Sequence, residues 1–108
     1  MTSQNDKLEK LVALLEQHTP QEGPQRTCIE NLGVARVSSP HTKLSALYEP
    51  GIYMVGQGRK RCYVGDRMFE YGAGDFMALF LPMPVEVEVL EASPDKPFLT
   101  AGLLIDSD

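Results

Sequence analysis

The most regular hydrophobic pattern lies near the start of the chain. Four apolar side chains recur at the i, i+3, i+4, i+7 spacing of one helix face: Leu8, Leu11, Val12 and Leu15. Asp6 with Glu9 three residues later suits a helix start, and Pro20 ends the pattern. An amphipathic helix is predicted over residues 6–18. A helix this short is only marginally stable in isolation. Its apolar stripe must therefore pack on its own domain or on a second copy of the chain.

After the turn-rich stretch TPQEGPQ, which reads as a linker, short apolar runs alternate with Gly, Pro, Ser and Asp. These runs predict strands near residues 28–31, 33–38, 43–48, 51–56, 60–64, 67–71, 76–81, 85–91 and 98–105. Strands at this spacing are typical of an antiparallel sandwich or small barrel. We therefore expect a helix and linker over residues 1–24 and a mainly β domain over residues 25–108.

Two stretches allow faces and register to be assigned. In VEVEV the three valines alternate with Glu86 and Glu88, which indicates one buried and one wet face. The turn Gly65-Asp66 joins two strands, and counting from it sets Arg61 opposite Glu70. Because side chains alternate along each strand, the hairpin residues divide between two faces. The face expected on the core side carries Cys62, Val64, Phe69 and Tyr71, and the opposite face carries Arg61, Tyr63, Met68 and Glu70. Another apolar file is Leu99, Ala101, Leu103 and Ile105.

Composition narrows the class of protein. The 108 residues suit one domain, and 43% hydrophobic with 23% charged residues is ordinary for a globular chain. No apolar run approaches the roughly 20 residues of a membrane helix, and MTSQNDKLEK is too polar to begin a secretory signal. Cys28 and Cys62 form no CxxC, so reduced thiols are expected. Together these features predict a cytoplasmic protein without a membrane partner.

The charge balance argues against nucleic-acid binding by this segment. Net charge is −5, opposite in sign to the footprint of a phosphate-binding surface. The tight basic cluster Arg59-Lys60-Arg61 lies on a predicted strand, so Lys60 and Arg61 must point to opposite faces. Nor do Gly56 and Gly58 begin a dinucleotide loop, because the third glycine and the following helix of that motif are missing.

Catalytic and metal-binding patterns are sparse. The chain holds two histidines, and it has no HxH, HExxH, CxxC or G-x-S-x-G motif. Cys62 is the one candidate for reactivity, because Lys60 and Arg67 share its face and would lower its pKa. A small apolar core residue is the favoured interpretation of Cys62. The sequence thus predicts no catalytic residue, metal or other cofactor.

A series of short elements in fixed order resembles the N-terminal regulatory domain of AraC-type transcriptional regulators over about residues 32–106. The elements are Pro50, then Gln57-Gly58-x-Lys60, Gly65-Asp66, Tyr71 with Gly74, Pro84-Val85, Ala92-Ser93 with Pro97, and a strand from Leu103 to Asp106. The stretch YGAGDFMALFLP is also similar to the second half of a general cupin repeat.

The resemblance implies a cupin-like β-barrel or sandwich that binds a small organic effector. In such regulators a C-terminal pair of helix-turn-helix modules reads the DNA. The chain ends at Asp108 without such modules, so we expect it to be part of a longer regulator that contacts DNA only through that domain. Effector binding would act by population shift, with a homodimer as a further partner. The candidate ligand-lining residues are Tyr53, Cys62, Phe69, Tyr71 and Phe80.

Two alternatives stay open. A small stand-alone cupin enzyme, similar to isomerases or oxygenases, would need a metal, yet the metal-cupin histidine pattern finds no histidine in either register that fits Gly56 or Gly58. Such an enzyme would depend on atypical ligands such as His41, Glu49 and Cys62. The other alternative is an interaction module that dimerises through the amphipathic helix and binds no ligand.

Overall fold

The computed structural model describes residues 4–105, which form one helix and nine strands. The elements are α1 (Gln4–His18), β1 (Gly23–Arg26), β2 (Leu32–Val37), β3 (His41–Tyr48), β4 (Gly51–Gln57), β5 (Arg59–Val64), β6 (Arg67–Gly72), β7 (Phe76–Leu79), β8 (Met83–Glu91) and β9 (Phe98–Leu104). No helix within residues 4–105 is long and apolar enough to cross a membrane.

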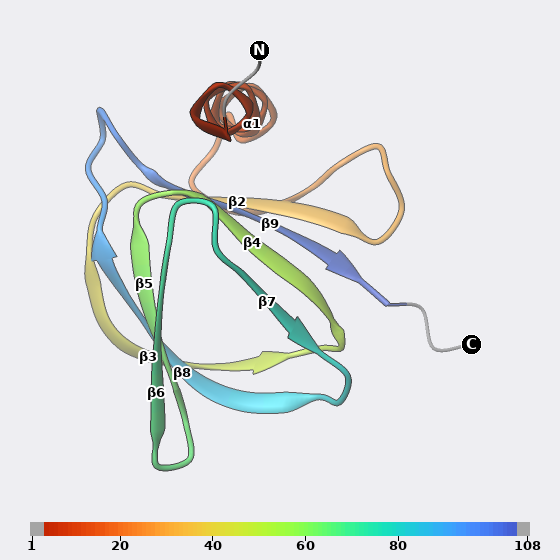
Figure 1. Cartoon of the computed structure of the whole chain (residues 1–108), viewed down its shortest axis with the longest axis vertical. Helices are drawn as coiled ribbons and strands as arrows, with labels where there is room; N and C mark the ends of the chain where they lie inside the picture. Colours follow the sequence, from red (N-terminus) through yellow and green to blue (C-terminus); the bar gives the residue numbers. More distant parts are fainter. Residues whose placement is uncertain (1–3, 106–108) are drawn as a thin grey trace.

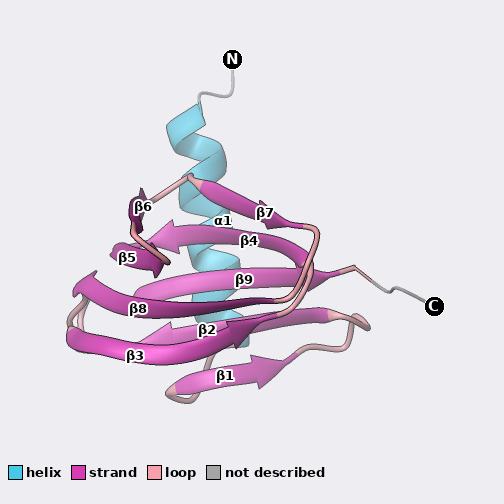
Figure 2. Cartoon of the chain, turned by 90° about the horizontal axis from the view of Figure 1, so that it is seen from below, coloured by secondary structure: helices cyan, strands magenta, loops and turns pink. Residues whose placement is uncertain are grey.

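The strands form two antiparallel sheets that face each other (Figure 1). One sheet has five strands in the order β1-β2-β9-β4-β7, and the other has four in the order β3-β8-β5-β6. Figure 2 shows the two sheets stacked as an open sandwich, with the edge strands β1 and β3 toward the same side. The predicted mainly β fold with one preceding helix is confirmed, in its sandwich form.

Helix α1 covers the outer face of the five-stranded sheet, away from the four-stranded sheet (Figure 1). Its buried residue Leu15 packs with Val34 and Leu99, and Leu11, Val12 and Ala101 surround this cluster. Gly56 permits the close approach, because a Cβ there would lie 2.5 Å from Leu15 Cδ1. The apolar stripe of the helix therefore packs on its own domain, which was one of the two predicted arrangements.

Strand β9 is apolar on both faces because it lies between two cores. Leu99 and Ala101 face the helix, whereas Phe98 joins Val55 and Val89 in a second cluster between the sheets. The valines of β8 point inward as predicted: Val85 and Val89 are buried, and Glu86 alternates with them on the exposed side. The two clusters hold the three layers of helix, sheet and sheet together.

The predictions were wrong at one place in the chain. Residues 28–31, predicted as a strand, form a turn in which Thr27 Oγ1 accepts a hydrogen bond from Ile29 N and Asn31 has a φ of 66°. The first strand of the structure, β1, lies earlier in the chain. It occupies part of the predicted linker and pairs with β2. Pro24 is tolerated in β1 because this is an edge strand with one unpaired side.

The β5–β6 hairpin has the register that counting from Gly65-Asp66 predicts. Arg61 pairs with Glu70, and Cys62 pairs with Phe69. Cys62 is buried and Tyr71 packs against the inner cluster, so this face is the core side. The expected terminal Asp106 of the last strand lies outside the described residues.

Gly58 joins β4 of one sheet to β5 of the other and cannot carry a side chain without strain. Its φ is +89°, and a Cβ would lie 2.6 Å from Glu91 O and 3.0 Å from Phe98 Cδ1. We expect Gly58→Ala to lower the free energy of unfolding by about 2 kcal/mol or more, from the left-handed backbone and the clash together. Urea denaturation measures this change.

Gly65→Ala is the matched control for that prediction. Gly65 has a φ of +61° with no other heavy atom within 4 Å of an added Cβ. This variant should lose only about 1 kcal/mol, the backbone contribution alone. Equal losses in the two variants would contradict the close packing assigned to Gly58.

Candidate ligand-binding site

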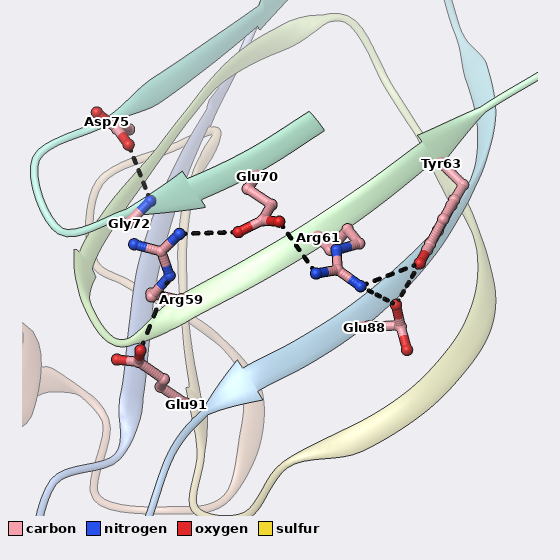
Figure 3. Close-up of polar contacts among 8 residues, drawn as sticks. All are labelled: Arg59, Arg61, Tyr63, Glu70, Gly72, Asp75, Glu88 and Glu91. Carbon is pink, nitrogen blue, oxygen red and sulfur yellow. Dashed lines mark hydrogen bonds and ion pairs between the residues drawn. The ribbon is translucent and has the colours of Figure 1, made fainter. Parts of the chain in front are cut away.

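The two arginines of the basic run lie on the outer face of the four-stranded sheet (Figure 3). Arg59 Nη2 lies 2.8 Å from Glu70 Oε1, and Arg61 Nη2 lies 3.0 Å from Glu70 Oε2. Glu91 lies 3.8 Å from Arg59, and Glu88 lies 3.6 Å from Arg61. Each arginine therefore has carboxylate partners, and this face is not a basic patch open to nucleic acid.

The same contacts change the ionisation of Glu70. Hydrogen bonds from Arg59 and Arg61 lower the pKa of the Glu70 carboxyl below its ordinary value. The pKa of Arg61 is raised by its hydrogen bonds with Tyr63 and Glu70. Both shifts favour the charged forms, as expected for a cluster whose charges compensate each other.

The middle residue of the run, Lys60, points the other way, into the space between the sheets. Its side chain is almost fully covered, with the residue 4% exposed. Lys60 Nζ donates a hydrogen bond to Tyr48 Oη at 3.1 Å. It also lies 5.1 Å from the centroid of the Tyr48 ring and 5.8 Å from that of Tyr71. Because side chains alternate along β5, Lys60 points between the sheets, whereas its neighbours Arg59 and Arg61 point to the outer face.

Lys60 lines a cavity of about 650 Å³ between the two sheets. The walls come from β1, β2, β3, β4, β5, β8 and β9, so both sheets contribute. Apolar wall residues include Val37, Val87, Val89, Phe98 and Leu104. Side chains with polar groups are Gln25, Arg26, His41, Tyr48, Tyr53, Lys60 and Thr100. A largely apolar cavity of this size with a few polar groups is typical of small-molecule sites.

Two tyrosines form one wall of the cavity. The rings of Tyr48 and Tyr53 are tilted by 35° with centroids 4.8 Å apart. Gly102 allows Tyr53 to lie flat on β9, since a Cβ there would be 2.9 Å from Tyr53 Cδ1. The Tyr53 hydroxyl donates to Glu49 O, and burial raises the pKa of Tyr53. Tyr53 therefore stays a neutral phenol that is fixed in place.

The structure places the five predicted ligand-lining residues differently. Tyr53 lines the cavity, and Tyr71 reaches it indirectly through its contact with Lys60. Cys62 is 0% exposed and lies on the inner face without lining the cavity. Phe69 is 40% exposed and Phe80 is 80% exposed, and neither lines the cavity. A ligand-binding role for all five stays a prediction, and only Tyr53 has a place in the cavity wall.

The atypical metal site required by the enzyme alternative is not assembled. Within residues 4–105, no three His, Cys, Asp or Glu side chains are grouped so that they could hold a metal ion. Of the suggested ligands His41, Glu49 and Cys62, only His41 lines the cavity.

Sequence reasoning missed five side chains that bring polar groups to the cavity wall, namely Gln25, Arg26, Tyr48, Lys60 and Thr100. For Lys60 the signal was present, because the counted register set it opposite Tyr71 on the face assigned to the core. Tyr48 and Thr100 carried no such signal, because their strands had no counted register.

Comparison with known proteins decides the family. The profile described as "AraC-type transcriptional regulator N-terminus" matches residues 28–108. The chain belongs to this family. No curated protein matches it. The family points to a regulatory role rather than an enzymatic one.

Two solved structures resemble this AraC-type domain in fold. One is a cupin-2 domain containing protein from Shewanella frigidimarina, with a TM-score of 0.53, 11% identity, and coverage of 86% of this chain and 88% of that one. The other is Drosophila melanogaster CENP-C bound to CAL1, with a TM-score of 0.53, 13% identity, and coverage of 91% and 99%. At such identities the likeness establishes the fold alone, and the first structure supports its cupin-like character.

The two cysteines should differ sharply in reactivity. Cys28 is exposed, whereas Cys62 is buried and burial raises the pKa of its thiol, with Lys60 opposing this only in part. We expect one thiol per native chain to react quickly with Ellman's reagent at pH 8, and both after unfolding. Cys28→Ser should abolish the fast reaction, and Cys62→Ser should leave it intact. A fast reaction in Cys28→Ser would contradict the inert thiol assigned to Cys62.

The outer carboxylate predicts a pH dependence of stability. A carboxyl whose pKa is lowered by folding contributes stability above its unfolded pKa, about 4.3 for glutamate, and loses it as pH falls through the lower folded value. Glu70→Gln should therefore be less stable than wild type at pH 7, and the difference should shrink as the pH falls through the lowered folded-state pKa of Glu70. Urea denaturation from pH 7 to 3 tests this.

Glu86→Gln is the control for that series. Glu86 is exposed on the same strand face as Glu88, and it forms no ion pair with the residues that the structure describes. Its substitution should leave the pH profile unchanged. A Glu70→Gln profile parallel to that of wild type would exclude the proposed linkage.

Proposed function

We propose that this chain is the effector-sensing domain of a bacterial AraC-type transcription regulator, and that a small organic molecule binds between its sheets. The family match supports the regulatory role. DNA would be read by a separate helix-turn-helix domain of the regulator in the cytoplasm. The bound ligand would shift the population of domain arrangements, through contacts with that domain or with a second subunit.

The observation that carries the proposal is the cavity between the sheets. At about 650 Å³ it falls within the range of small-molecule sites. Its walls come from strands far apart in the sequence, from β1 to β9. A molecule bound there would contact both sheets at once, so it could favour one spacing of the sheets over another. Differential contact of this kind is what a ligand needs to shift a conformational equilibrium.

A cavity-filling variant tests the proposal. Ala35 lines the cavity on β2, so Ala35→Phe would occupy the space that a ligand needs. The wild-type chain is screened by thermal shift against a library of small organic molecules, and hits are verified by calorimetry. We expect hits whose affinity falls at least ~10-fold in Ala35→Phe, since the variant and the ligand compete for one volume.

Ala78→Phe provides the matched control. Ala78 is exposed on β7 and does not line the cavity, so the same enlargement there should leave binding unchanged. Circular dichroism verifies that both variants are folded. Hits that bind both variants equally well would place the ligand elsewhere. A screen without hits would remove the sensing role of this cavity.

A further inference from the structure

The charge of Lys60 is buried without a carboxylate partner. Within the described residues, Lys60 forms no ion pair, and its single hydrogen-bond acceptor is Tyr48 Oη at 3.1 Å. An ammonium group has three N–H donors, so two have no acceptor among those residues. Burying a charge whose donors are unpaired is costly, and buried charges in proteins are normally paired and hydrogen-bonded, so a further partner for this ammonium is expected.

The rest of the cavity wall has the same sign of charge. Among the residues that the structure describes, its lining contains Arg26 and Lys60 and no aspartate or glutamate, although the whole chain has a net charge of −5 with 15 acidic residues. On the two strands that pair with β5, the carboxylates of Glu70 on β6 and Glu88 on β8 are engaged by the arginines on the outer face. These two carboxylates therefore lie outside this cavity, where a low dielectric strengthens electrostatic attraction.

Tyr48 adds a second donor at the same point. Its hydroxyl oxygen accepts the hydrogen bond of Lys60, so its own proton is left to donate. The Tyr48 and Tyr71 rings are already occupied by the Lys60 ammonium, at 5.1 and 5.8 Å. A cationic ligand would meet repulsion at these rings, whereas an anion would find an N–H and an O–H donor side by side.

We propose that the cavity takes an organic monocarboxylate with an apolar body, and that Lys60 binds its carboxylate with help from the Tyr48 hydroxyl. This inference rests on the proposed sensing function and specifies its ligand class. The valines, Phe98 and Leu104 of the wall would surround the apolar body. One buried ammonium matches one negative charge, so a single carboxylate suits the site better than a phosphate dianion.

The first test compares matched probes on the wild-type chain by calorimetry. Benzoate, cinnamate and octanoate are each paired with the primary amide of the same body, which keeps the shape and removes the charge. We expect at least one carboxylate to bind, ~10-fold or more tightly than its amide, as for a hydrogen bond to a charged group. Equal affinity for acid and amide overturns the inference while leaving the sensing function standing. Binding by no probe of either class overturns the inference, whereas the sensing function is decided separately by the library screen.

The second test removes the charge. Lys60→Met keeps the length and apolar stem of the side chain, and it should abolish the preference for carboxylates over amides. Lys43→Met is the matched control, because Lys43 also lies over a tyrosine ring, 4.0 Å from the centroid of Tyr63, but is exposed and does not line the cavity. Tyr48→Phe should weaken carboxylate binding without abolishing it. Retained preference in Lys60→Met overturns the proposed role of the lysine.

A measurement without any ligand separates a binding lysine from a structural one. If Lys60 is held for a ligand, Lys60→Met relieves an unpaired buried charge, and its Tm should equal or exceed that of wild type. Bound carboxylate should then raise the Tm of wild type more than that of the variant. If Lys60 instead stabilises the fold through Tyr48, both Lys60→Met and Tyr48→Phe will lower the Tm, and the inference is overturned.

Discussion

The central constraint on this domain is that strand β9 is apolar on both faces and must be covered on both. Helix α1 covers one side through Leu15 and its neighbours, and the four-stranded sheet covers the other through Val89. Neither cover is large alone, and a helix of 15 residues gains its stability from such packing. The helix is therefore a structural layer of the domain, and it leaves the space between the sheets to other uses.

That space is where the fold departs from simple core packing. Around Val55 it is filled with apolar side chains, but beside Lys60 it opens into a cavity edged by β1 and β3. The walls there combine valines with tyrosines and a covered cation, which is a poor way to stabilise a core and a good way to hold a polar head group. The regulatory family and the geometry of the cavity thus support the same kind of role.

Much of the fold followed from local patterns in the sequence. The period of 3.6 in α1 and the period of 2 in β8 fixed these elements, and the Gly65 turn fixed the hairpin register residue by residue. The strand β1 was missed because its Pro and Gly content is typical of loops, and only the edge of β2 makes it a strand. That pairing is a tertiary effect, and no local pattern within residues 23–26 predicts it.

The candidate site was less predictable because it depends on which inner residues meet across the sheets. The counted register set Phe69 on the inner face, and Phe80 was added as a neighbouring aromatic residue, yet both are substantially exposed outside the cavity wall. The same register also set Lys60 on the inner face, and this residue does line the cavity. A residue whose chemistry conflicts with its predicted burial is thus a better pointer to a cavity than one that merely fits a core.

The register of β5 also limits how the length of this segment can change. Because inside and outside alternate at every residue, deleting one residue between Gly58 and Gly65 would exchange the two faces, turning Arg61 inward and Lys60 toward solvent. The Gly65 turn has open space around it and can lengthen without that exchange. Insertions in natural variants of this domain should therefore gather at the hairpin tip, while residues 59–64 keep a fixed count.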